Sequence, residues 1–234
     1  MDAGMMSSGL FLDWTIILII PGMLLAIWAQ SKVKSTFAKY SKVFSSRGVQ
    51  AQQIASQMLH NQQLYDVTVK QVQGNLTDNY NPTNKTLNLS QSVYGSSSIA
   101  SIGVAAHEAG HAIQHGKGYR PLVLRSFMYP AVKIGSTLSW PIFLFGILFS
   151  AQPLMKIGII AFAITVVFTL ITLPVEFDAS KRAVAILQND GYLTEIEVNG
   201  ARKVLNAAAL TYVASAVNAI LQLLRLVLLS RRRR

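Results

Sequence analysis

Long apolar runs flanked by basic residues dominate this sequence and set the first limit on how it can fold. The most continuous run is Ile157–Val175, and two others are Trp14–Ala29 and Ile134–Ser150. Each comes close to the roughly 20 apolar residues that a helix needs to cross a bilayer. Only 13% of the residues are charged, against about a quarter in soluble domains. We therefore predict a mainly α-helical membrane protein with three transmembrane helices.

Basic residues mark one side of the predicted membrane. Residues 1–13 contain no lysine or arginine, whereas Lys32–Arg47 is rich in lysine, and Lys181 and Arg182 follow the third run. Because cytoplasmic loops carry an excess of basic residues, we predict the N-terminus outside the cell and the next segment inside. This topology signal accounts for the net charge of +11. We predict no nucleic-acid partner, since no basic stretch is interleaved with aromatic residues.

A fourth apolar run, Val204–Ser230, carries a polar stripe along one face of a predicted helix. The stripe consists of residues spaced by three or four positions: Thr211, Ser215, Asn218, Gln222 and Arg225. A full span would also carry the four terminal arginines outside, against the charge rule. We therefore expect an amphipathic helix that lies on the bilayer or packs on the cytoplasmic domain. The alternative is a true span whose stripe faces other helices or an aqueous cleft.

Residues 48–121 are soluble in composition. Their periodicity predicts helices over Val49–Leu59 and Ile99–His115, and short strands over Asp66–Gln73 and Thr86–Leu89. The chain then divides into four predicted parts. These are a transmembrane anchor at 1–31, a cytoplasmic α+β domain at 32–132, a transmembrane hairpin at 133–175 and a cytoplasmic helical region at 176–234.

The pattern His107-Glu108-Ala109-Gly110-His111 indicates a metal site within the second soluble helix. Residues four apart lie on one face of a helix, so both imidazoles can reach one ion. Glu108 lies beside that ion, where its carboxylate can accept a proton from water. Small apolar residues surround the motif, which is typical of a buried helix. The chain has no cysteine, so any metal must be held by histidines and carboxylates.

A catalytic zinc site usually has three protein ligands and one open position, so a third ligand is needed. His60 is most simply a surface residue. His115 lies one turn beyond His111, and we interpret it as a cleft residue or as part of a solvated helix end. Glu176 follows the third apolar run, so the hairpin returns it to the membrane face where the motif stands. It is equally well explained as the start of an interfacial helix, where a carboxylate interacts favourably with the helix dipole.

Three segments, Leu76–Thr86, Gly103–His115 and Ala207–Ala214, resemble the YugP-like family of bacterial membrane zinc metallopeptidases, and the resemblance covers nearly the whole chain. The layout is also similar to that of the broader group of integral-membrane gluzincins. In that group the histidine motif precedes a transmembrane hairpin, and a glutamate beyond the hairpin completes the site. The resemblance implies a bacterial plasma-membrane protein with a small gluzincin-like catalytic domain facing the cytoplasm.

The resemblance also implies roles for individual residues. It makes Glu176 the third ligand of one zinc ion per chain and Glu108 the general base of peptide hydrolysis. The group's later motif is similar to Glu-x-x-Ala-Asp, and this chain has Ser180 where the group has the aspartate that orients a histidine. Ser180 could orient a histidine only more weakly, and Asp178 should face elsewhere on a helix. Gluzincins bind substrate along an edge strand, for which Thr86–Leu89 is the candidate unless it is an internal strand.

Two functions follow as expectations. The first is a zinc-dependent endopeptidase that acts on peptide or membrane-protein substrates at the bilayer surface. The alternative is a non-catalytic scaffold or regulatory membrane protein with a structural zinc site, which would need a fourth protein ligand such as His115 or Asp178. The sequence leaves open a homo-oligomer or a regulatory membrane partner.

Overall fold

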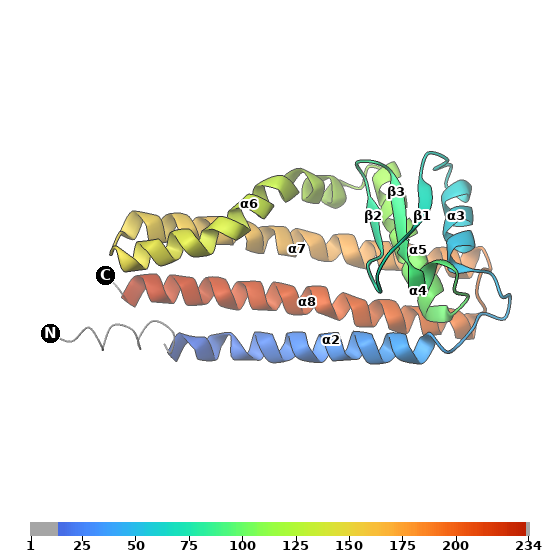
Figure 1. The fold of residues 1–234 in the computed structure, drawn as a ribbon, viewed down its shortest axis with the longest axis horizontal. Coiled ribbons are helices and arrows are strands. Elements are labelled where there is room, and N and C mark those ends of the chain that lie inside the picture. Colours follow the sequence, from blue (N-terminus) through green and yellow to red (C-terminus); the bar gives the residue numbers. More distant parts are fainter. Residues whose placement is uncertain (1–13, 233–234) are drawn as a thin grey trace. The chain divides into compact units, whose positions relative to one another are not determined.

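The computed structural model describes residues 14–232, most of which are helical (Figure 1). Residues 1–13, which we predict to lie outside the cell, are not among the described residues, and neither are the last two residues of the arginine tail. The elements are, in chain order, η1 (Trp14–Leu18), α2 (Ile20–Tyr40), α3 (Ala51–Asn61), β1 (Thr68–Val72), β2 (Asn79–Asn81), β3 (Thr86–Ser90), α4 (Gln91–Tyr94), α5 (Ile99–Gly116), α6 (Arg120–Leu148), α7 (Gln152–Asn189) and α8 (Glu195–Arg232).

Four helical segments within residues 14–232 are long and apolar enough to cross a membrane. They are Trp14–Tyr40, Arg120–Leu148, Gln152–Asn189 and Glu195–Arg231. The first and third contain the predicted spans Trp14–Ala29 and Ile157–Val175, and the second covers the predicted span Ile134–Ser150 except for its last two residues. The fourth contains the run whose path was ambiguous. Two compact units emerge from the contacts, and the long helices contribute residues to both. Among the described residues, the first unit comprises 14–28, 126–170 and 213–232, and the second comprises Ala29–Arg125 and Ile171–Tyr212.

Two residues of the polar stripe of α8, Asn218 and Arg225, lie close to other segments of the first unit. A Cβ atom on Gly22 of α2 would lie 2.9 Å from Asn218 Oδ1, so the two helices approach closely there. Arg225 is buried, and its Nε donates to Thr15 Oγ1 at 3.4 Å. Polar side chains at membrane depth are expected to face protein or water rather than lipid. This arrangement favours the alternative prediction of a true span over a helix lying on the bilayer.

The second unit contains a three-stranded sheet in the order β1-β3-β2. β1 pairs with β3 in parallel, and β2 pairs with β3 antiparallel, with Tyr80 opposite Leu87. The candidate substrate strand Thr86–Leu89 is therefore internal, and its expected role as an edge strand is wrong. The sequence prediction missed β2, because its three residues lie next to the turn around Pro82 and are too few for an alternating pattern to show.

The helix α5 lies at the centre of the second unit, with α3, α4 and the sheet around it (Figure 1). Part of α7 packs on its other side. In the part of α7 that belongs to the second unit, buried apolar residues recur every four positions, at Val175, Ala179, Ala183 and Leu187. This continuous stripe explains why α7 runs on to Asn189, beyond the predicted hairpin boundary at 175. Glu176 consequently lies inside a helix, and the interpretation of this residue as a helix start is wrong.

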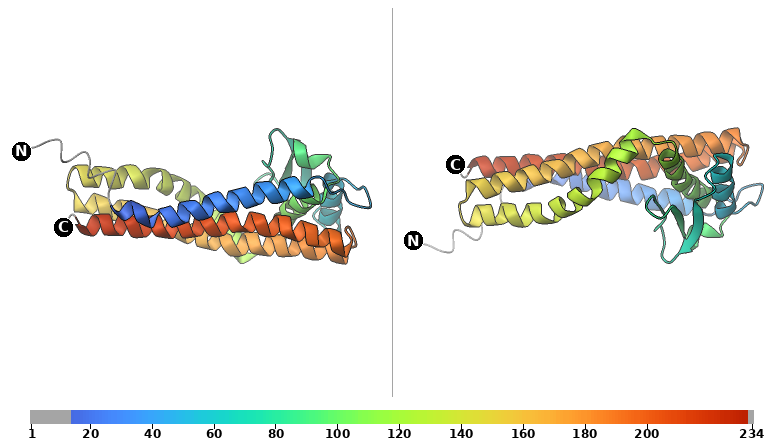
Figure 2. Two further views of the ribbon diagram at one scale, coloured as in Figure 1. Left: turned by 90° about the horizontal axis from the view of Figure 1, so that it is seen from below. Right: turned by 90° about the horizontal axis from the view of Figure 1, so that it is seen from above.

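Small residues bring α5 close to its neighbours. A Cβ atom on Gly110 would lie 2.6 Å from the backbone oxygen of Ala179, so only glycine allows α7 to approach this closely. A Cβ atom on Gly103 would lie 3.5 Å from the Cβ atom of Ala201 in α8, which is an ordinary contact distance. The views in Figure 2 show α7 and α8 running side by side, and residues of both line one hollow in the second unit.

Candidate metal centre

The two histidines of the motif project from the same face of α5. The helix is capped by Ser98, whose hydroxyl accepts a hydrogen bond from the backbone N–H of Ser101. The rings of His107 and His111 lie 4.7 Å apart between centroids in an edge-to-face arrangement. Both rings can therefore present a nitrogen to the same point, as the four-residue spacing predicts.

Glu176 reaches the same point from α7. Its Oε2 lies 3.2 Å from His107 Nε2 and 3.4 Å from His111 Nε2. The carboxylate is only 3% exposed. The close packing at Gly110 helps to bring α7 near enough for this contact.

The spacing of these three ligand atoms fits a zinc ion. All three lie within 4.8 Å of one another. Ligand atoms about 2.0–2.2 Å from a tetrahedral zinc ion lie about 3.3–3.6 Å apart, close to both measured distances to Glu176. A buried carboxylate beside two imidazoles is also a donor set that zinc prefers. His107, His111 and Glu176 could therefore hold one zinc ion.

A hydrogen-bond chain fixes the ring of His111. The Nε2 of the fully buried Gln114 donates to the backbone oxygen of Val175 and to Asp178 Oδ2, both at 2.8 Å. Since both of those groups can only accept, the remaining amide oxygen of Gln114 faces His111 Nδ1, at 3.0 Å. His111 must then carry its proton on Nδ1, which leaves Nε2 free to bind a metal.

Ser180 supports the other histidine. Its Oγ lies 3.1 Å from His107 Nδ1, so the Nε2 of His107 likewise faces the metal point. Asp178 turns away from the three ligand atoms and pairs with Arg182 while accepting from Gln114. Ser180, for which the resemblance implies only weak support of a histidine, thus does contact a histidine of the motif.

Two further side chains contact Glu176. Arg125, in the first part of α6, places Nη1 3.2 Å from Glu176 Oε1, the oxygen that does not face the histidines. Tyr212 of α8 is a hydrogen-bonding neighbour of the same carboxylate. Together they can hold the carboxylate so that Oε2 points at the histidines.

Glu108 is buried beside the histidines, with 9% of its surface exposed. Burial raises the pKa of its carboxyl, the charges of His107 and His111 oppose this, and the nearby carboxylate of Glu176 adds to it. A carboxyl group in such surroundings can take up and release a proton more readily than one in water.

The other candidate metal ligands lie away from the group formed by His107, His111 and Glu176. His115 is hydrogen-bonded through Nδ1 to the Tyr80 hydroxyl at 2.8 Å, in a separate hollow near the end of α5. Burial raises the pKa of Tyr80 to about 12, so its hydroxyl stays protonated at neutral pH. His60 is exposed and contacts Tyr65. Within residues 14–232, neither His115 nor Asp178 joins the group of ligand atoms, so the fourth ligand of a closed structural site is not found there.

Sequence reasoning missed three residues of this centre. Gln114 carries a signal that could have revealed it, because it lies three residues after His111 and so on the same side of the helix. Arg125 and Tyr212 carry no such signal, since they come from helices whose packing the sequence does not specify.

A buried pair of imidazoles and a carboxylate, in a chain with several helices able to cross a membrane, fits a membrane protein with a metal site. The chain matches the family described as "Putative neutral zinc metallopeptidase" over residues 15–231, and it belongs to that family. It is similar to "Putative membrane protease YugP" of Bacillus subtilis (strain 168). The two are 48% identical over 214 residues, which cover 92% of this chain and 95% of the relative. No solved structure matches the chain.

Proposed function

We propose that this protein is a zinc-dependent membrane endopeptidase in which His107, His111 and Glu176 hold the metal. The observation that carries the proposal is the spacing of their ligand atoms, 3.2 and 3.4 Å from the histidines to one oxygen of Glu176. When bound, zinc supplies a Lewis acid that polarises the scissile carbonyl and makes water a better nucleophile. The family and the named relative support peptide-bond hydrolysis as the reaction.

Glu108 is the proposed general base. Its neighbours on α5 are the two proposed ligands, so its carboxylate is close enough to accept a proton from the attacking water. The same carboxyl can then deliver that proton to the amine that leaves. Arg125 and Tyr212 keep Glu176 in place during these steps.

The edge strand β2 is the proposed place for an extended substrate. It packs against α5 and has β3 on only one side, so its other edge can pair with a peptide backbone. This assignment replaces the expected role of Thr86–Leu89. The substrate is then a peptide or a segment of a membrane protein that reaches the bilayer surface.

The proposed orientation follows from charge. Lysines from Lys32 onward follow the first span, and Lys181 and Arg182 follow the apolar part of the third. We place these residues, and with them the metal centre, on the cytoplasmic side of the plasma membrane.

The direct test is Glu108→Gln in the full-length protein purified in detergent. We expect about one zinc ion per chain, as in the wild type. Cleavage of a quenched-fluorescent peptide library should fall by about 100- to 10,000-fold, as expected for loss of a general base. Unchanged cleavage by a zinc-loaded variant would refute the role of Glu108, and wild-type protein without zinc would refute the metal centre.

A further inference from the structure

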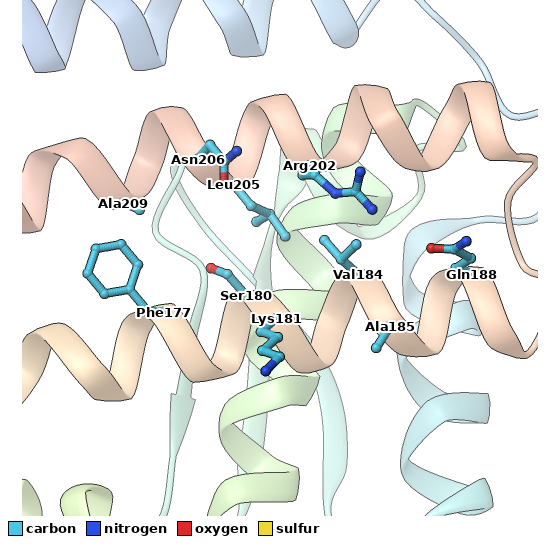
Figure 3. Close-up of a pocket in the computed structure, with 10 residues that line it drawn as sticks. All are labelled: Phe177, Ser180, Lys181, Val184, Ala185, Gln188, Arg202, Leu205, Asn206 and Ala209. Atoms are coloured by element: carbon cyan, nitrogen blue, oxygen red, sulfur yellow. The ribbon is translucent and has the colours of Figure 1, made fainter.

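A hollow of about 350 Å³ lies between α7 and α8 in the second unit. Figure 3 shows Arg202 reaching from α8 toward α7, with Gln188 of α7 at the same end of the hollow. Phe177 and Ala209 lie at the opposite end. Val184 and Ala185 also lie toward the Arg202 end, and Ser180 and Asn206 lie between the two ends. The hollow therefore has a guanidinium group at one end and an aromatic ring at the other.

The two ends correspond to different depths in a membrane. The end with Phe177 and Ala209 adjoins the apolar stretches of both helices, because α7 is apolar up to Val175 and the mainly apolar run of α8 begins at Val204. The first basic residues that follow an apolar span are expected at the level of the lipid headgroups. The basic end of the hollow thus lies at headgroup depth, and the apolar end lies toward the hydrocarbon.

The basic end lacks an anion. Arg202 Nη1 donates to Asn199 Oδ1 at 2.9 Å, which orients the guanidinium without neutralising it. Lys181 lines the hollow on the α7 side and extends away from α8 (Figure 3). Among the ion pairs of residues 14–232, none involves Arg202 or Lys181. Arg182, by contrast, is neutralised by Asp178.

We propose that this hollow binds an anionic glycerophospholipid. The lipid phosphate would lie against the guanidinium of Arg202, which offers several donors in a planar array suited to phosphate oxygens. The side chain of Lys181 extends away from α8, and its flexible ammonium group would have to rotate to meet a headgroup at the rim. The start of an acyl chain would lie along Phe177 and Ala209.

The shape and charge of the hollow separate this ligand from others. A soluble anion would leave the apolar end without a partner. A lipid with a choline headgroup would bring a positive charge toward Arg202 and Lys181. An anionic lipid offers a partner of opposite charge at one end and an acyl chain at the other.

The lipid site is distinct from the metal centre but adjacent to it. Ser180 lines the hollow, and its Oγ is the atom that lies 3.1 Å from His107 Nδ1. The proposal itself does not depend on zinc or on catalysis, because lipid binding can be measured in the absence of both.

The test is native mass spectrometry of the delipidated full-length protein. The protein is offered equimolar phosphatidylglycerol and phosphatidylcholine with the same acyl chains. We expect the wild type to retain phosphatidylglycerol preferentially. Lys181→Gln/Arg202→Gln should lower that preference about ten-fold, the effect of losing a charge-assisted phosphate contact. Arg202→Gln alone should show most of the loss, which keeps the test decisive if the double variant does not fold.

The matched control is Lys42→Gln/Lys203→Gln, which removes the same charge at exposed positions outside the hollow. It should keep the wild-type preference. Equal loss in both double variants would indicate general surface attraction and overturn the proposal. Equal retention of the two lipids by the wild type, or displacement of bound phosphatidylglycerol by millimolar inorganic phosphate, would overturn it too. So would a protein dimer that forms in the wild type and disappears in Arg202→Gln, because the hollow would then be an interface.

Discussion

The link between Gln114 and His111 gives the sharpest test of how the metal centre is built. Replacement of Gln114 by methionine keeps the length and volume of the side chain but removes all three of its hydrogen bonds. The Nδ1–H of His111 then loses Gln114 Oε1 as its acceptor, and the Val175 carbonyl loses one donor. Asp178 keeps its partner Arg182. The imidazole of His111 becomes free to rotate or to move its proton to Nε2, where the proton blocks metal binding.

Two magnitudes follow from these contacts. Loss of the group that orients a metal-binding histidine weakens metal affinity by about 10- to 100-fold, which is about 1.4–2.7 kcal/mol. The buried donor left unpaired should also lower the free energy of unfolding of the metal-free protein by about 1–3 kcal/mol.

The assay is competition for zinc between the protein and a fluorescent chelator. Thermal unfolding of the metal-free protein, followed by circular dichroism, measures the stability change separately. Asp178→Asn serves as the control, because asparagine keeps an oxygen that can accept from Gln114 Nε2. Its zinc affinity should stay close to that of the wild type. A folded Gln114→Met variant with wild-type zinc affinity would refute the reasoning.

Three further predictions use the same measurements. Gly110→Ala should lower the free energy of unfolding by about 1–3 kcal/mol, because its new methyl group would overlap the α7 backbone. Gly103→Ala should leave the free energy of unfolding unchanged or raise it slightly. Equal changes in this free energy for Gly110→Ala and Gly103→Ala would contradict the conclusion that α5 packs more closely on α7 at Gly110 than on α8 at Gly103. Arg125→Gln should weaken zinc binding by about two- to ten-fold through a less firmly held Glu176; an unchanged affinity would remove Arg125 from the centre. His115→Gln should leave zinc content and affinity unaltered, and loss of zinc would mean that this ring reaches the metal.

The sequence determined the features that depend on local spacing and composition. Long apolar runs require a membrane or a large core, and the low fraction of charged residues favoured the membrane. The four-residue spacing of His107 and His111 directs both rings to one side of a helix whatever surrounds it. Family membership could likewise be recognised from motifs, and the match over residues 15–231 confirms it.

The sequence made Glu176 a candidate third ligand, but only the tertiary structure decided which groups meet those histidines. The contact of Glu176 with both rings depends on how closely α7 approaches α5 at Gly110, and helix packing of this kind is not encoded in spacing along one chain segment. Gln114 acquires its role because one amide can contact α5 and α7 at once. The order of the strands, which made Thr86–Leu89 internal, was equally beyond local reasoning, since pairing joins residues that are distant in the sequence.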